Sequence, residues 1–145
     1  FLRHAETLNR AGVAAKAAGL KMGYHNHSFE FEVQGGGETG YGALLRLCEE
    51  DLVSFELDLF WAVNAGQSPT DIFAAHPGRF QMVHVKDRAI DGTMVDVGSG
   101  LINFAEIFSH SDAAGIEHYF VENDTPSDGI RSASNSIRAI NAIRF

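Results

Sequence analysis

The chain has 145 residues, of which 45% are hydrophobic and 21% charged, and it carries a formal net charge of −8. This composition is ordinary for a globular domain with a hydrophobic core. The excess of 19 acidic over 11 basic residues argues against nucleic-acid binding, which needs a basic surface. The single cysteine, Cys48, excludes an intrachain disulfide and a cysteine-based zinc site. No apolar run of roughly 18 residues is present, so no membrane span is predicted.

The first residues, Phe1-Leu-Arg-His4, contain no initiator Met and no signal-peptide pattern. Their pattern is that of the middle of a helix, so we expect the chain to be a fragment of a longer protein. We expect a cytoplasmic location, and a periplasmic one stays open because the native N-terminus is expected to lie upstream.

Helices and strands alternate along the whole chain. The apolar spacing and the Gly and Pro positions predict helices over 1–19, Tyr41–Glu50, Ser68–Ala75, Asn103–Ala114 and from Thr125 to about Ala142. Short apolar runs predict strands over 20–25, Val53–Asp58, Phe80–Val85 and Glu117–Val121, with loops at 28–38, 76–79 and 87–100. The last helix is expected to turn Ile130, Ile137 and Ile140 toward the core.

This alternation predicts an α/β fold. Short, largely apolar strands are typical of a parallel sheet that is buried on both faces. Polar side chains gather at the carboxyl ends of the strands, which is the catalytic face of a (β/α)₈ barrel and the ligand edge of an open doubly wound sheet. No Gly-x-Gly-x-x-Gly motif or P-loop follows the first strand, which disfavours a nucleotide-binding sheet. A full barrel needs about 250 residues, so we predict a single partial barrel over residues 1–145 with about four βα units.

Four predicted strands end in a side chain that can bind a metal ion. They end at or next to His25, Asp58, His84 and Glu122. Mixed imidazole and carboxylate ligands suit Mn²⁺, Zn²⁺, Co²⁺ or Fe²⁺ better than Ca²⁺. His27 lies on the same side of its strand as His25, and we expect His25 to be the ligand and His27 to contact substrate or a ligand.

Other residues near these strand ends have both a functional and a structural interpretation. Trp61 follows Asp58 and is expected to form an aromatic wall against a sugar, although packing in the barrel also explains it. Lys86 is expected to bind substrate and Asp87 to orient His84 or Lys86, although a solvated loop pair explains both residues equally well. Asn26 is a third expected substrate contact. Glu56 lies two residues before Asp58 and is expected deeper in the barrel, as a buried polar partner or an inner-layer residue.

These residues carry a family resemblance. The segments Gly23-Tyr-His-Asn-His-Ser-Phe-Glu-Phe31, Glu56-Leu-Asp-Leu-Phe-Trp61, His84-Val-Lys-Asp87 and Tyr119-Phe-Val-Glu122 resemble the sugar phosphate isomerase/epimerase group of the xylose-isomerase-like TIM-barrel superfamily. The resemblance covers nearly the whole chain and corresponds to the C-terminal half of the barrel. It implies a divalent metal ion at the barrel mouth, with Mn²⁺, Zn²⁺, Co²⁺ and Mg²⁺ as candidates.

The resemblance also implies the roles of individual residues. The common ligand set of the superfamily is Glu, Asp, His and Glu, which Asp58, His84 and Glu122 match, while His25 takes the place of the first Glu. In the epimerases, two such carboxylates exchange a proton at the carbon next to a carbonyl. Here Glu122 keeps one of these places, and His25 or His27 is the candidate for the other base because an imidazole titrates near neutral pH. The implied activity is isomerisation or epimerisation of a sugar or related polyol.

Three alternatives remain from the sequence. A metal-dependent dehydratase of a sugar or cyclitol shares the first proton abstraction with an isomerase. An endonuclease-IV-like enzyme needs a further His three residues after the Asp, where Trp61 stands, and the acidic charge also disfavours it. A non-catalytic carbohydrate-binding half-barrel would expose its sheet edges, so two copies would be expected to pair as a homo-oligomer.

Overall fold

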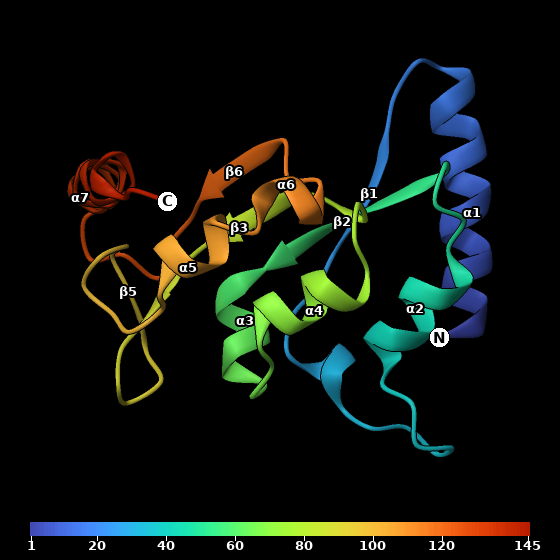
Figure 1. Ribbon diagram of the computed structural model, residues 1–145, viewed down its shortest axis with the longest axis horizontal. Coiled ribbons are helices and arrows are strands. Elements are labelled where there is room, and N and C mark those ends of the chain that lie inside the picture. Colours follow the sequence, from blue (N-terminus) through green and yellow to red (C-terminus); the bar gives the residue numbers. More distant parts are fainter.

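Four parallel strands form the central sheet of the computed structural model, which describes residues 1–145 (Figure 1). The strands are β1 (Met22–His25), β2 (Val53–Asp58), β3 (Phe80–Val85) and β6 (His118–Val121). They lie in the order β1-β2-β3-β6, which is their order along the chain. All four carboxyl ends therefore meet at one edge of the sheet, as a TIM-barrel-type α/β fold requires.

Helices connect the strands and pack along one face and at the two edges of the sheet. They are α1 (Leu2–Ala17), the 3₁₀ turn η1 (Phe29–Phe31), α2 (Gly40–Leu47), α3 (Leu59–Asn64), α4 (Pro69–Ala75), α5 (Phe104–Phe108), α6 (Ser111–Ala114) and α7 (Gly129–Ala142). Figure 1 shows α1 next to β1, α2 against α1, and α7 next to β6. No helix is long and apolar enough to span a membrane.

Only one face of the sheet is covered by this chain. Alternate residues of β2, which are Val53, Phe55 and Leu57, are fully buried under the helices. The residues between them, Ser54 and Glu56, are half-buried on the other, inner face. The expectation of a sheet buried on both faces is therefore wrong for these 145 residues, because no segment of this chain packs over the inner face.

The predicted strands β2 and β3 have the observed bounds, whereas several helices differ. α3 was not predicted, and it begins because the Asp58 side chain caps it by accepting a hydrogen bond from Trp61 N. The helix predicted over 103–114 is two helices, α5 and α6. α7 begins at Gly129 with Asp128 as its cap, later than predicted. Within the loop predicted over 87–100, β4 (Asp87–Arg88) pairs with β5 (Met94–Val95).

The predicted inner face of α7 is partly wrong. Ile130 is 83% exposed and Ile137 is 48% exposed, while Ser132 and Ser136 are buried. The helix packs through these small hydroxyl side chains, since Ser136 Oγ accepts a hydrogen bond from Val97 N at 3.1 Å. Polar contacts with Asp96 and Val97, which directly follow β5, therefore set the orientation of α7, and the spacing of its isoleucines does not.

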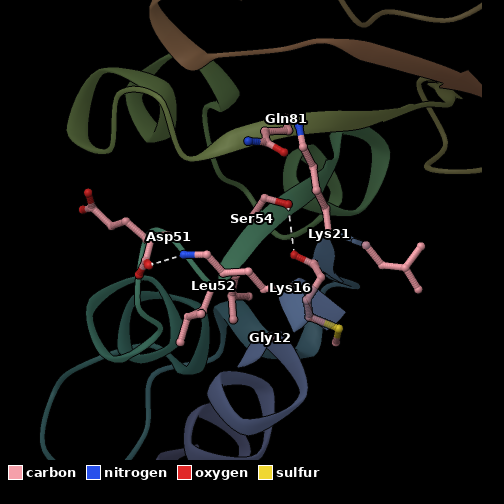
Figure 2. Close-up of a pocket in the computed structure, with 11 residues that line it drawn as sticks. Gly12, Lys16, Lys21, Asp51, Leu52, Ser54 and Gln81 are labelled. Carbon is pink, nitrogen blue, oxygen red and sulfur yellow. Dashed lines mark hydrogen bonds and ion pairs between the residues drawn. The ribbon is translucent and has the colours of Figure 1, made fainter. Parts of the chain in front are cut away.

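A cavity of about 270 Å³ lies at the amino ends of the strands, between α1, β1 and β2 (Figure 2). Lys16 and Asp51 pair across it at 2.7 Å, and Ser54 Oγ donates a hydrogen bond to the Met22 carbonyl. Both members of the Lys16–Asp51 pair are mostly exposed. The polar strand ends described next lie at the other end of the sheet.

Candidate metal centre

The four polar strand ends come together at the carboxyl edge of the sheet. His25 ends β1 and Asp58 ends β2, and the parallel register places Asp58 beside His84 of β3. His25, Asp58 and His84 each offer one ligand atom, and these atoms all lie within 4.8 Å of one another. Glu122 follows β6 and brings its Oε2 to 3.1 Å from His84 Nδ1. The structure thus brings together the residues proposed from the sequence as ligands.

Three atoms of this cluster are buried without a hydrogen-bond partner. They are His25 Nδ1, Asp58 Oδ2 and His84 Nδ1. Two of these atoms do have charged neighbours, since His84 Nδ1 lies 3.3 Å from Asp58 Oδ2 and 3.1 Å from Glu122 Oε2, and Lys86 Nζ lies 3.2 Å from Asp58 Oδ2. Buried polar atoms are nearly always hydrogen-bonded, so a cluster held by such ion-pair contacts alone leaves lone pairs available to an ion. Two imidazoles and a carboxylate form a donor set that suits a divalent transition metal. The residues present therefore fit a divalent ion.

Lys86 provides a buried positive charge beside these carboxylates. Its side chain is 3% exposed, and Nζ lies 2.7 Å from Glu122 Oε2, 2.9 Å from Asp124 Oδ1 and 3.2 Å from Asp58 Oδ2. Burial alone lowers the pKa of Lys86, but the three carboxylates outweigh it and raise the pKa above its ordinary value. The solvated-loop interpretation of Lys86 is therefore wrong, because its ammonium group is buried among carboxylates at the strand ends.

The two imidazoles of the cluster have opposite pKa shifts. Burial, together with the nearby His84, lowers the pKa of His25, and the two rings lie 4.4 Å apart. Burial also lowers the pKa of His84, but Asp58, Glu56 and Glu122 outweigh it and raise the pKa. Although burial by itself raises the pKa of Asp58, contacts with His84, Trp61 N and Lys86 hold it below its ordinary value.

Two buried side chains fix the turn that follows β1. Asn26 is fully buried, and its Oδ1 accepts a hydrogen bond from Asp58 N at 2.9 Å while its Nδ2 donates to the His27 carbonyl. Glu30 is buried as well and accepts hydrogen bonds from Tyr24 Oη and His27 N. The structure thus places Asn26 behind the cluster, where its amide serves the backbone, rather than on a surface open to a substrate.

His27 and Trp61 lie next to each other at the rim of the cluster. The exposed His27 ring is 5.0 Å from the ring of His25 and 5.5 Å from that of Trp61. Trp61 is half-buried on α3, and its indole N–H has no hydrogen-bond partner. The exposed imidazole of His27 and the accessible part of the Trp61 ring lie next to the candidate ligands and are groups that a polyol can contact, whereas the indole N–H is buried.

Asp87 has a different place from the one expected. It is 1% exposed, and its carboxylate accepts hydrogen bonds from four backbone N–H groups. The donors are Arg88, Gly98, Gly100 and Ile102. Asp87 therefore fixes the loop from 88 to 102 and makes no hydrogen bond or ion pair with His84 or Lys86.

Two contacts of the cluster were missed by the sequence reasoning. Asp124 binds Lys86, and Glu56 Oε1 lies 3.3 Å from His84 Nε2. Both residues stand two positions from a proposed ligand, Asp124 after Glu122 and Glu56 before Asp58. Alternation along β2 predicts Glu56 on the same side as Asp58, as a buried polar partner or an inner-layer residue, but spacing along the chain does not identify His84 as that partner.

A parallel α/β sheet with a histidine and carboxylate cluster at its carboxyl edge is the arrangement of a metal-capable TIM-barrel-type protein. The chain belongs to the xylose isomerase-like TIM barrel family, whose model matches residues 2–144. This match confirms the resemblance found in the motifs.

Similar proteins include a dehydratase, a sugar phosphate isomerase/epimerase and a 3-epimerase. The chain is 30% identical over 135 residues to an inosose dehydratase of Geobacillus thermodenitrificans (strain NG80-2), an alignment that covers 79% of this chain and 43% of that protein. The crystal structure of a sugar phosphate isomerase/epimerase from Parabacteroides distasonis ATCC 8503 superposes with a TM-score of 0.81 and 32% identity, over 97% of this chain and 52% of that one. A D-psicose 3-epimerase shares the fold, with a TM-score of 0.67 at 14% identity over 94% of this chain and 53% of that one. The chain thus spans about half the length of these relatives.

Proposed function

We propose that this chain forms the metal-binding half of a divalent-metal-dependent isomerase or epimerase that acts on a sugar or related polyol. The observation that carries the proposal is that His25, Asp58 and His84 each bring one ligand atom to within 4.8 Å of the others at the carboxyl edge of the sheet. The 32% identity with a sugar phosphate isomerase/epimerase supports the substrate class.

In this proposal His25, Asp58, His84 and Glu122 hold the ion. When bound, such an ion supplies Lewis-acid polarisation of a substrate carbonyl or hydroxyl pair. Mn²⁺, Zn²⁺, Co²⁺ and Mg²⁺ remain the candidates, and the two imidazoles favour the transition metals. Lys86 balances the negative charge of Asp58 and Glu122, which lie 3.2 Å and 2.7 Å from its Nζ.

The proton transfer is assigned to groups at the rim of the cluster. Glu122 is 46% exposed and His27 is exposed, so a substrate carbon can approach either side chain. One of them removes the proton from the carbon next to the polarised carbonyl, and the other returns a proton. Trp61 lies against His27, where its half-buried ring can pack on the substrate.

A dehydratase is the second candidate, and the 30% identity with an inosose dehydratase favours it. Removal of the same proton is followed there by departure of the hydroxyl on the next carbon as water. A screen of ketoses and cyclitols in D₂O separates the two reactions. An isomerase or epimerase gives a product with the composition of the substrate, except for deuterium incorporated from the solvent. A dehydratase gives a product that has lost one molecule of water.

The metal content of the purified protein tests the proposal directly. We expect about one equivalent of a transition metal in the wild-type protein and in His110→Ala, because His110 is exposed and lies away from the cluster. We expect His84→Ala to lose the bound metal. Removing a residue that only supports a ligand lowers metal affinity by about 10–100-fold, and removing a ligand itself should lower it at least as much. Equally low metal content in all three proteins contradicts the metal centre.

A further inference from the structure

The imidazole of His84 has carboxylates on both sides of its ring. Its Nδ1 lies 3.1 Å from Glu122 Oε2 and 3.3 Å from Asp58 Oδ2, at the carboxyl edge of the sheet. Its Nε2 lies 3.3 Å from Glu56 Oε1. The ring therefore presents one nitrogen to the candidate metal centre and the other to Glu56.

The parallel sheet holds Glu56 in this place. Glu56 and Asp58 project from the same side of β2, because side chains alternate along a strand. In the register of β2 and β3, Asp58 is paired with His84 and Glu56 with Met82. Glu56 therefore lies two residues closer than Asp58 to the amino end of β2. The Glu56 carboxylate is 18% exposed, and it makes no other ion pair and no side-chain hydrogen bond.

A neutral imidazole has one N–H and one nitrogen lone pair, and only the lone pair can bind a metal ion. Ionised carboxylates accept hydrogen bonds and donate none. With Glu122 and Asp58 alone as neighbours, the favourable tautomer of His84 carries its proton on Nδ1 and directs it at those carboxylates. That tautomer turns the lone pair away from the other candidate ligands.

We propose that Glu56 is a positioning residue, which accepts the proton of His84 Nε2 and so keeps the Nδ1 lone pair directed at the metal centre. This inference rests on the proposed metal-dependent function. A carboxylate behind a ligating histidine fixes the tautomer and the ring orientation and raises the basicity of the ligand. Glu56 acts through His84 and does not touch the ion or the substrate.

The state of the His84 ring separates this role from a purely structural one. We expect the ¹⁵N NMR shifts of metal-free wild-type protein, at a pH where the ring is neutral, to report the Nε2–H tautomer of His84. In Glu56→Gln we expect a shift toward the Nδ1–H form, because the amide N–H group can donate to Nε2. If the wild-type protein shows the Nδ1–H tautomer of His84, the proposal is wrong, and no variant is needed to reach that conclusion.

Metal affinity gives the second readout, and Co²⁺ titration followed by absorption spectroscopy is the measurement. We expect Glu56→Gln to bind Co²⁺ about 10–100-fold more weakly than wild type, and Glu56→Asp to recover part of the loss. The matched control is Glu32→Gln, which removes the same charge from an exposed side chain that makes no hydrogen bond or ion pair. Equal affinities in Glu56→Gln and wild type overturn the role of Glu56, whereas absence of Co²⁺ binding in wild type overturns the proposed metal centre itself.

Discussion

Asn26 connects two neighbouring strand ends through one side chain. Its Oδ1 accepts from Asp58 N in β2 and its Nδ2 donates to the His27 carbonyl after β1. Because the residue is fully buried, water cannot replace either hydrogen bond if the amide is removed. The relative position of His25 and Asp58 therefore depends on this amide.

We predict that Asn26→Ala lowers the free energy of unfolding by about 1–3 kcal/mol, since it leaves Asp58 N buried and unsatisfied. Urea denaturation followed by circular dichroism measures this change. The control is Asn141→Ala, an exposed position on α7, where we expect a change within about 0.5 kcal/mol. Equal stability of the two variants would show that Asn26 is not a structural link.

At the scale of single residues, the strand-end pattern was enough to find the cluster. His25, Asp58, His84 and Glu122 each stand where a predicted strand ends, and parallel strands place such positions at one edge. The pattern did not find the charge partners of Lys86 or the contact between Glu56 and His84. Those contacts depend on side-chain conformations across strands, which spacing along the chain does not specify.

At the scale of elements, the strands were predicted better than the helices for a physical reason. β2 and β3 are short apolar runs with buried alternate residues, and their bounds follow from that pattern. The segment Leu59-Phe-Trp61 is as apolar as a strand, so only the capping geometry of Asp58 reveals that α3 starts there. In α7 the contacts of Ser132 and Ser136 decide the buried face, and hydrophobic periodicity cannot identify a face that packs through hydroxyl groups.

The loop after β3 is an element whose shape depends on one carboxylate. Asp87 holds backbone N–H groups up to 15 residues further along the chain. At Gly100 a Cβ atom would lie 2.6 Å from the Arg88 carbonyl oxygen and would also collide with Asp87, so the loop and the carboxylate are closely packed. Because Asp87 directly follows Lys86, this anchor also limits where the Lys86 ammonium group can lie.

We predict that Asp87→Asn loosens this loop, since an amide has one acceptor oxygen where the carboxylate has two. Hydrogen exchange at Gly98, Gly100 and Ile102 should accelerate by about 10-fold or more, which corresponds to a loss of at least about 1.4 kcal/mol of local protection. Asp112→Asn, at an exposed position of α6, is the matched control and should leave these amides unchanged. Unchanged exchange in Asp87→Asn would mean that the loop is held by other contacts.

At the scale of the whole molecule, the sheet ends in two unpaired strands. β1 pairs only with β2, and β6 pairs only with β3. Unpaired strand edges are templates for association with another chain. On β6 the edge also carries exposed aromatic rings, since Tyr119 is 38% exposed and Phe120 is 46% exposed. Relatives about twice as long share this half of the fold, so their remaining residues are available to cover such edges.

We predict that the 145-residue chain, purified by itself, associates as its concentration rises. Phe120 is paired in register with His84 and therefore lies on the uncovered inner face beside the β6 edge. Phe120→Lys should weaken association, because the charged ammonium group would lose its hydration when a second chain covers the edge, and that loss is unfavourable. Ile90→Lys replaces an apolar side chain that is 87% exposed in the turn between β4 and β5, two strands that pair with neither edge of the sheet, and should associate like the wild type. Size-exclusion chromatography with light scattering over a hundredfold range of concentration measures this. A wild-type monomer throughout the range would mean that the charge of −8 and the short strands are enough to keep the open edges apart.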